Sequence, residues 1–400
     1  MASLTLADIR AAQARIKGRV LRTPAIRCDV ISRAVGAEVT LKLDNLQATG
    51  AFKERGAANR LAMLSEDERK AGVIAVSAGN HAQAVARHAS LLGITAVIVM
   101  PQFTPLTKVS RTAGWGARVV LHGETLADAS AHAHELAARE GLVFVHPFDD
   151  LAVAAGQGTL ALELLEDAPE LNTLVIPIGG GGLIAGCAVA AAGIKPGIEI
   201  IGVEVAAYAA VAQRLAGQPV HVGGATIAEG IAVRDIGEQT YPIIRGHVAD
   251  VLVVPERAVE EAIALLAEGA KVVAEGAGAA GVAALLAFPD RFKGRKIGVP
   301  VCGGNIDARI FANVLLRNLL RDGRLTRLVL EIPDRPGVLA DIAGRIGGAG
   351  GNIIDVSHHR LFASPSVQAA QLEVMFEARD AVHGAEIVRG LEQIYTVRRI

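Results

Sequence analysis

The chain has 400 residues, of which 51% are hydrophobic and 20% are charged, so it can bury a core and is not a mainly disordered protein. Forty lysines and arginines against 41 acidic residues leave a net charge of -1, which attracts neither nucleic acid nor an anionic membrane. We therefore expect a small-molecule partner, no nucleic acid and no membrane.

The cysteines and the N-terminus point to a reducing compartment. The sequence has three cysteines, which lie far apart and form no CxxC pair (Cys28, Cys187, Cys302); this predicts neither a disulfide framework nor a zinc site. Charged residues within positions 8–17 interrupt any apolar export signal, which favours the cytoplasm. The uncharged stretch 171–194 contains a proline and four consecutive glycines, so it predicts a strand, a loop and a helix rather than a membrane span.

Short runs rich in valine and isoleucine alternate with helical stretches along most of the chain. The runs cover residues 73–79, 95–101, 117–123, 142–148, 173–179, 199–205, 250–255 and 296–304. Apolar strands separated by helices predict an α/β fold with parallel sheets covered on both faces. Ligands bind such sheets at the carboxyl ends of the strands, where this chain has the loops SAGNH, GGGG and CGGN.

The pattern changes after the basic stretch 321–327. A strand at 327–334 and a helix at 337–350 are followed by two strands, a helix and a last strand. This βαββαβ order predicts a separate, ferredoxin-like domain at about 326–400, after a linker at about 318–326.

Three segments carry the candidate chemistry. Lys53, in NLQATGAFKERGAANRL, precedes a helix and taken alone is an ordinary surface lysine. The segment PIGGGGLIAG (177–186) joins a strand to a helix with a backbone that can wrap a phosphate closely. The segment VSAGNHAQAVA places three polar residues at a helix start, where free N–H groups favour a carboxylate (Ser77, Asn80, His81).

Together with CGGN, these segments resemble the fold-type II pyridoxal-phosphate enzymes, most closely the threonine dehydratase and serine racemase branch. The family signatures SxxGAFKxRG, SxGNHAQ, GGGGL and SGGN all have counterparts in the same order. The resemblance covers residues 1–320, with a smaller subdomain at about 50–150. It implies a tryptophan synthase β-like fold of two parallel-type sheet subdomains, and pyridoxal 5'-phosphate as the cofactor.

The resemblance also implies roles for individual residues. Lys53 would hold the cofactor through a Schiff base and take the α-proton of the substrate, and Phe52 would pack on the ring. Since a lysine has a solution pKa of about 10.4, desolvation must lower that pKa before the amine can react. Asn80 would bind the 3'-oxygen of the ring, and the substrate carboxylate would lie against Ser77, Asn80 and His81. Backbone N–H groups would bind the phosphate, and further residues would contact the cofactor (Gly179, Gly180, Gly181, Gly182; Gly230, Glu275, Cys302).

Three departures from the family pattern narrow the chemistry. Cys302 stands where the family commonly has a serine facing the pyridine nitrogen; unless it is merely a small buried residue, a thiol there favours prompt β-elimination over transamination. Racemases of this branch have a second serine after the one matching Ser77, and Ala78 in its place favours elimination over racemisation. Glu204 matches one acid of a family cation site, but Ala210 replaces the other, so we expect no metal.

Other motifs predict no further site. The GxGxxG at 276–281 follows a helical pattern rather than a strand, so it predicts close helix packing and no dinucleotide site. His132 and His134 point to different sides of a helix and are not expected to bind a metal. His358 and His359 alternate along a strand, one facing inward and one outward.

The C-terminal module resembles an ACT domain through DRPGVLADIAGRI. Its strand-to-helix turn would bind the carboxylate of an amino-acid effector (Asp334, Arg335, Pro336, Gly337). The alternative, that the module only joins subunits, stays open at this point. On family grounds we expect a homo-oligomer, a dimer or a tetramer.

These features predict a pyridoxal-phosphate-dependent ammonia-lyase that converts L-threonine to 2-oxobutanoate and ammonia, with L-serine as a second substrate giving pyruvate. A serine racemase is the first alternative, and Ala78 argues against it. A hydroxyaspartate dehydratase would need spare cationic groups for a second carboxylate. A non-catalytic amino-acid sensor would have no need for Lys53 or the glycine loop. Isoleucine biosynthesis and threonine breakdown both remain open as the pathway.

Overall fold

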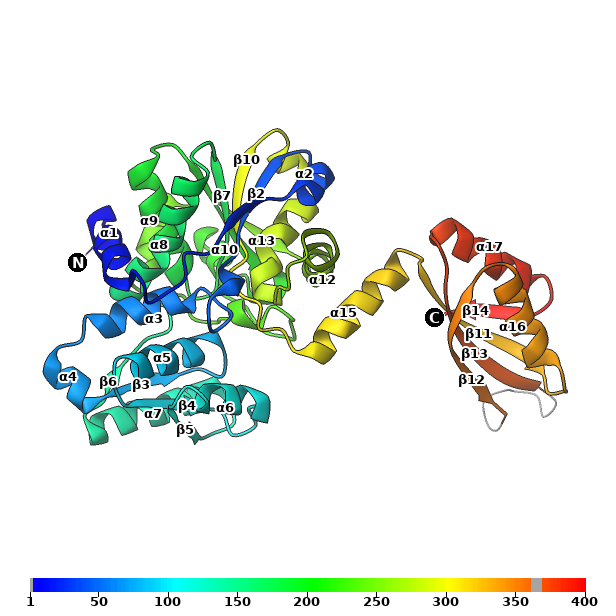
Figure 1. Cartoon of the computed structure of the whole chain (residues 1–400), viewed down its shortest axis with the longest axis horizontal. Coiled ribbons are helices and arrows are strands. Elements are labelled where there is room, and N and C mark those ends of the chain that lie inside the picture. Colours follow the sequence, from blue (N-terminus) through cyan, green and yellow to red (C-terminus); the bar gives the residue numbers. More distant parts are fainter. Residues whose placement is uncertain (1–2, 361–368) are drawn as a thin grey trace. The chain divides into compact units, whose positions relative to one another are not determined.

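The computed structural model describes residues 3–360 and 369–400 (Figure 1). Internal contacts divide the chain into two units, Met1–Ile306 and Asp307–Ile400. The predicted linker at 318–326 is the end of a helix, α15 (Ala308–Arg321), then a turn and the first residues of a strand. Among the described residues, no helix has both the length and the apolar composition needed to cross a bilayer.

The first unit contains two sheets, and all their strands except β1 and β2 lie in the predicted apolar runs. One has six strands in the order β1-β2-β10-β7-β8-β9; its strands are parallel except β1, which pairs antiparallel with β2. The other has four parallel strands in the order β5-β4-β3-β6. The bounds are β1 (Ala25–Arg27), β2 (Glu38–Lys42), β3 (Val73–Val76), β4 (Ala96–Met100), β5 (Arg118–Leu121), β6 (Val143–Phe144), β7 (Thr173–Pro177), β8 (Glu199–Val205), β9 (Asp250–Val254) and β10 (Lys296–Pro300). The predicted α/β class with parallel sheets is confirmed.

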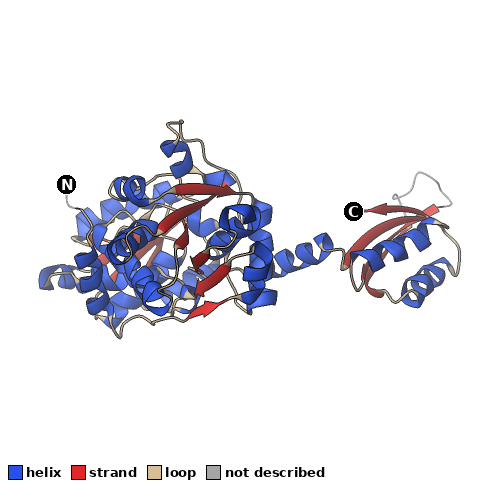
Figure 2. Ribbon diagram, turned by 90° about the horizontal axis from the view of Figure 1, so that it is seen from above, coloured by secondary structure: helices blue, strands red, loops and turns tan. Residues whose placement is uncertain are grey.

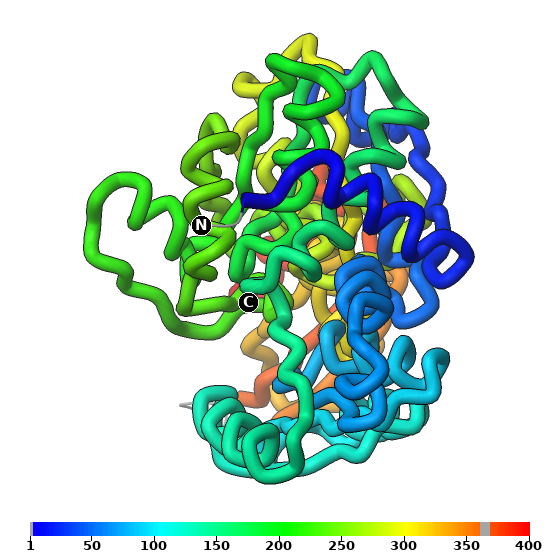
Figure 3. Tube along the Cα trace, turned by 90° about the vertical axis from the view of Figure 1, so that its left-hand side faces the viewer, coloured from blue at the N-terminus to red at the C-terminus, as the bar shows by residue number. Residues whose placement is uncertain are grey.

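Helices surround the strands of this unit (Figure 2), and α1 packs against α8 and α9 (Figure 3). Residues 182–191 of α9 are all buried, because this helix is apolar on every side. The helices are α1 (Leu6–Ile16), α2 (Asp29–Val35), α3 (Lys53–Ala62), α4 (Glu66–Ala71), α5 (Asn80–Leu91), α6 (Leu106–Ala113), α7 (Leu126–Glu140), α8 (Leu151–Asp167), α9 (Gly182–Ile194), α10 (Ala210–Leu215), α11 (Thr240–His247), α12 (Glu256–Leu265), α13 (Gly276–Ala287) and α14 (Pro289–Phe292).

Three sequence interpretations can be compared with this unit. The run 142–148 forms only a two-residue strand, because its remainder turns away as a loop beside the site described below. The GxGxxG lies in α13 with no strand before it, and a Cβ at Gly278 would overlap the carbonyl of Gly303, so close packing explains its glycines. His132 stacks on His122 and His134 on Phe144; among the described residues no cluster of potential ligands could hold a metal.

The second unit has a four-stranded antiparallel sheet in the order β12-β13-β11-β14. Alternate residues of β11 and β13 are buried with apolar residues of two helices, and the elements follow the predicted βαββαβ order. His358 is partly buried and His359 is exposed, as the alternation predicts. The bounds are β11 (Leu325–Pro333), α16 (Val338–Gly348), β12 (Asn352–His359), β13 (Ala369–Glu377), α17 (Ala381–Glu392) and β14 (Thr396–Arg399).

Candidate active site

Lys53 begins α3, and the turn before it is attached to the loop that follows β10. The Phe52 N–H donates to the carbonyl of Cys302 (2.9 Å), and the carbonyl of Gly50 accepts from the Gly304 N–H (2.9 Å). Side chains continue this attachment, because Asn305 Nδ2 donates to the carbonyl of Thr49 (2.7 Å). Two predicted cofactor residues far apart in sequence, Phe52 and Cys302, are therefore neighbours in the fold.

The Lys53 amine lies where it can lose its charge. Its Nζ donates to the carbonyl of Pro147 (2.7 Å) and lies 5.3 Å from the centroid of the Phe52 ring. Desolvation lowers the pKa of this amine to about 8, although the nearby Cys302 acts in the opposite direction. A sizeable fraction of Lys53 is thus neutral near pH 8, as a nucleophilic amine requires.

The three residues predicted for the carboxylate pocket lie at the first turn of α5. Its N-cap residue, Gly79, has no side chain, so the first N–H groups of the helix remain available to an anion. Ser77 Oγ accepts from the Gly79 N–H (3.1 Å), which places it beside this turn. Asn80 is the first helical residue and His81 the second. The structure therefore brings together the three residues that the sequence predicts here.

His81 is the buried member of the three residues predicted for the carboxylate pocket. Its ring is buried, and desolvation lowers its pKa to about 3, with the charge of Lys53 adding to the effect. A neutral ring whose Nε2 lies 3.0 Å from the carbonyl of Val145 donates from Nε2, which leaves Nδ1 as an acceptor. Nδ1 is buried without a partner. The ring therefore offers an acceptor nitrogen that suits a hydroxyl or ammonium donor of a ligand.

Asn80 is held at both ends of its amide. Its Oδ1 accepts from Asn305 Nδ2 (2.7 Å), and its Nδ2 donates to Glu275 Oε1 (2.7 Å). An amide nitrogen carries two hydrogens, so one N–H of Asn80 is left to donate to a ligand. Desolvation raises the pKa of Glu275 to about 7, and the charge of Glu229 adds to this. Asn305 was missed as a site residue, although its position in a loop at a strand end was a usable signal.

The glycine loop, residues 179–182, connects β7 to α9 and packs on Phe148. Gly181 has a φ of +95°, and no side chain caps the helix that follows it. Cβ atoms at Gly180 and Gly182 would collide with Phe148, so the loop backbone approaches that residue directly. Because Phe148 follows the residue whose carbonyl binds Lys53, the loop and Lys53 are close together.

Replacing Gly180 by alanine should weaken cofactor binding. The added Cβ would overlap the ring of Phe148, and overpacking of this kind costs about 1–3 kcal/mol. Titration with pyridoxal 5'-phosphate, followed by visible absorbance, measures the change. Gly246→Ala is the control, because a Cβ at this position in α11 meets no atom within 4 Å. Equal cofactor affinities in the two variants would contradict the expected role of the loop.

Cys302 lies buried at the end of β10. Its Sγ is 3.5 Å from the carbonyl of Ala277, to which it donates, and burial together with the charge of Glu275 raises the pKa of the thiol. The group is therefore an uncharged thiol at neutral pH. Gly230, the remaining predicted contact, is close to the same atoms, since a Cβ on it would lie 2.9 Å from Ala277 and 3.6 Å from Glu275 Oε1.

The state of Cys302 predicts the effect of two substitutions. Cys302→Ser keeps a small neutral donor, so substantial elimination activity should remain. Cys302→Asp adds a buried negative charge near Glu275 and would hold the pyridine nitrogen protonated, so the elimination rate should fall about tenfold or more. Steady-state rates and the yield of transamination product measure both effects. An aspartate variant with the wild-type rate would show that Cys302 does not face the nitrogen.

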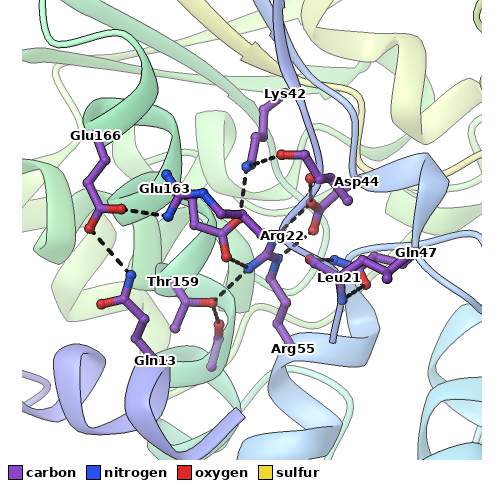
Figure 4. Close-up of polar contacts among 12 residues, drawn as sticks. Gln13, Leu21, Arg22, Lys42, Asp44, Gln47, Arg55, Thr159, Glu163 and Glu166 are labelled. Carbon is purple, nitrogen blue, oxygen red and sulfur yellow. Dashed lines mark hydrogen bonds and ion pairs between the residues drawn. The ribbon is translucent and has the colours of Figure 1, made fainter. Parts of the chain in front are cut away.

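A buried ionic cluster surrounds Arg55, the second residue after Lys53. Arg55 is fully buried and donates to both carboxylate oxygens of Asp44 and of Glu163, and Lys42 lies 2.8 Å from Glu163 (Figure 4). This cluster connects α3 with α8 and with the end of β2. This cluster cannot be predicted from the sequence, because its charged residues lie on separate elements and meet only after folding.

Glu204, which matches one acid of the family's cation site, binds backbone groups. The Glu204 carboxylate accepts from the N–H groups of Val211 and Ala212 (2.8 Å each), so it serves the start of α10. Desolvation raises the pKa of Glu204 to about 7.

The residues present fit pyridoxal 5'-phosphate. An amine with a lowered pKa can bind its aldehyde carbon, and the uncapped, glycine-lined start of α9 suits its phosphate. Two buried polar atoms have no hydrogen-bond partner in the chain and could bind a ligand: Thr49 Oγ1, in the turn before Lys53, and His81 Nδ1, in the first turn of α5. Comparison with known proteins agrees, since residues 16–303 match the family model described as "Pyridoxal-phosphate dependent enzyme".

The chain belongs to this family. It is 42% identical over 396 residues to the L-threonine ammonia-lyase of Thermotoga maritima, covering 97% of each chain. It is 41% identical over 322 residues to a catabolic L-threonine dehydratase of Staphylococcus aureus, covering 79% of this chain and 93% of that one. Among solved structures, maize serine racemase has 36% identity and a TM-score of 0.74, covering 80% of this chain and 99% of its own. The first unit thus has the fold of these pyridoxal-phosphate enzymes, and the second adds an antiparallel sheet.

Proposed function

We propose that this enzyme is a threonine ammonia-lyase, which converts L-threonine into 2-oxobutanoate and ammonia and also accepts L-serine. The observation that carries the proposal is that Lys53, with its lowered pKa, lies near both His81 in the first turn of α5 and Phe148, on which the glycine loop packs. The relative from T. maritima, aligned over nearly the whole chain, is named for this activity and supports it.

Each part of the site has a task in this reaction. When bound, pyridoxal phosphate withdraws electrons from the bonds of the α-carbon of an amino acid. Lys53 Nζ would bind the aldehyde carbon in the resting enzyme and, once displaced by the substrate, take the α-proton. The free N–H of Asn80 would orient the cofactor ring, and the first turn of α5 would bind the substrate carboxylate. Gly179–Gly182 would bind the phosphate through backbone N–H groups.

Release of 2-oxobutanoate from L-threonine by the purified chain with added pyridoxal 5'-phosphate tests the proposal. L-Serine and 3-hydroxyaspartate are compared in the same assay, and D-serine is measured from L-serine. If D-serine forms from L-serine faster than 2-oxobutanoate forms from L-threonine, the racemase is favoured. Ala78 argues against the racemase, because it has no acidic group to protonate the α-carbon. Bound cofactor without any product would contradict a lyase, and absence of bound cofactor would favour a sensor.

A dicarboxylate substrate is disfavoured by one ion pair. Lys108 is within electrostatic reach of Glu275, but its Nζ lies 2.7 Å from Glu229 Oε2. Its charge is therefore already matched, and it offers no unpaired cation to a second carboxylate.

For the second unit we propose an ACT-like regulatory domain of about residues 326–400 that binds an amino acid at the turn Asp334–Gly337. Gly337 caps α16 without a side chain, which leaves N–H groups for a carboxylate, and Asp334 pairs with Arg360 (3.2 Å). Calorimetric titration of the full chain with isoleucine, valine, threonine and serine tests this. If none of these amino acids releases heat beyond that of binding at the active site, a role in joining subunits is favoured.

Mass spectrometry of the intact assembly tests the proposed dimer or tetramer. The name of one relative, a catabolic L-threonine dehydratase, supports threonine breakdown as the pathway, and isoleucine biosynthesis is the alternative.

A further inference from the structure

We propose that Glu54, the residue after the reactive lysine, is a positioning residue that sets Lys53 in register with the carboxylate pocket. The expected change in kcat rests on the proposed function. The expected change in the circular dichroism of the bound cofactor does not. This role follows from where the two oxygens of the Glu54 carboxylate bind.

Glu54 connects two parts of the site. Its side chain is 0% exposed. Oε1 accepts from the backbone N–H of Thr49 (2.8 Å), at the start of the turn that carries Lys53. Oε2 accepts from Arg87 Nη1 and from His88 Nε2 (2.7 Å each). Arg87 and His88 lie on α5, whose first turn forms the pocket, so one carboxylate joins the lysine turn to the pocket helix.

The backbone bonds of the lysine turn run to the loop that follows β10. The turn is attached to residues 302–305, at the end of a strand of the six-stranded sheet. The helix α5 follows β3, which belongs to the four-stranded sheet. The lysine turn and the first turn of α5 therefore lie beside strands of different sheets. Two side chains bridge them: Asn305, which binds the Thr49 carbonyl and Asn80 Oδ1 (2.7 Å each), and the carboxylate of Glu54, which binds the Thr49 N–H and the side chains of Arg87 and His88.

Three donors meet this carboxylate, and only an ionised acid can satisfy them all. Burial acts to raise the pKa of Glu54, but the hydrogen bond from His88 and the charges of His88 and Arg87 outweigh it and lower the pKa. His88 is 2% exposed; Arg87 is partly exposed and also lies over the Trp115 ring, 5.6 Å from its centroid. A glutamine would have one acceptor oxygen and an NH₂ group. Either the Thr49 N–H or Arg87 would then face a donor, which breaks the connection at one end.

The first experiment compares Glu54→Gln with Glu199→Gln. Glu199 is a matched control: it is a half-buried glutamate bound by two arginines, Arg291 and Arg295, at the amino end of β8, whereas the site lies at the carboxyl ends of strands. We expect Glu54→Gln to lower kcat by about tenfold or more with little change in KM, since a small misplacement of a reacting group has effects of this size. The circular dichroism of the bound cofactor should fall as well. Glu199→Gln should match the wild type in both readouts.

A second variant separates positioning from stability. Glu54→Met with His88→Leu replaces the buried pair by apolar side chains of similar volume, a change that often preserves or raises stability. The proposal expects a folded protein with an unchanged melting temperature but a reduced cofactor circular dichroism and kcat, because the Thr49 N–H has lost its acceptor. Wild-type dichroism and kcat in this variant, or losses no larger than those of Glu199→Gln, would overturn the proposal. If the wild type releases no 2-oxobutanoate, the proposed function fails while the dichroism comparison still tests Glu54.

Discussion

Replacing Lys53 by alanine should lower 2-oxobutanoate formation by about 10⁴-fold or more while the chain stays folded. The amine is the group that the site offers both to bind the cofactor and to take the α-proton. Burial lowers the pKa of this amine, and its Nζ donates to the carbonyl of Pro147. Alanine has no amine to replace it. Single-turnover and steady-state release of 2-oxobutanoate measure the loss. The visible absorbance of lysine-bound cofactor should disappear in parallel.

The same position has a pH-dependent effect on stability without cofactor. A lysine whose pKa is lowered from 10.5 to about 8 by folding destabilises the folded state while both states are protonated, which holds below about pH 8. Between about pH 8 and pH 10.5 the penalty shrinks as the folded amine loses its proton. Lys53→Met apoprotein should therefore melt at a higher temperature than wild-type apoprotein at pH 7. A melting-temperature difference that does not narrow above pH 8 would contradict the lowered pKa.

Arg55→Leu should reduce the free energy of unfolding by about 3–5 kcal/mol, enough to unfold a marginally stable protein. Arg55 is fully buried between the carboxylates of Asp44 and Glu163 (Figure 4), and its removal leaves these two acids with Lys42 as the remaining cation of the cluster. The loss of stability arises because a buried carboxylate is desolvated, and without Arg55 no ion pair or hydrogen bond compensates for that desolvation. Urea unfolding followed by circular dichroism measures it.

An exposed ion pair provides the control for Arg55. Arg257 pairs with Glu261 one turn along α12 (2.7 Å) and is mostly exposed. Since solvent screens such pairs, Arg257→Leu should change the free energy of unfolding by less than about 1 kcal/mol. A similar small change for Arg55→Leu would mean that water or a shift of α8 compensates the two acids.

Much of the first unit can be predicted because its signals are local. A parallel strand buried on both faces is apolar throughout, so the run 95–101 predicts β4 without any knowledge of its neighbours. Loops such as GGGG and SAGNH are recognisable because their chemistry depends on adjacent residues. Such signals were absent for β1 and β2, which are short and carry charged residues at their ends. The predicted strand at 142–148 was too long for a related reason, since local composition does not show where pairing with β3 stops.

Pairings across long stretches of sequence account for the rest. Lys53, Asn80, the glycine loop and Cys302 are recognisable one by one, but their meeting depends on β10 pairing with both β2 and β7. Of the partners that orient them, Asn305 belongs to the recognisable CGGN loop, whereas Glu54 is a polar residue without a distinctive pattern of its own. A hydrogen bond or ion pair between residues 225 positions apart, such as Asn305 with Asn80, leaves no trace in either segment. Residue types therefore identify the chemistry from the sequence, whereas the electrostatic environment that tunes each group arises from burial and contacts that exist only in the folded chain.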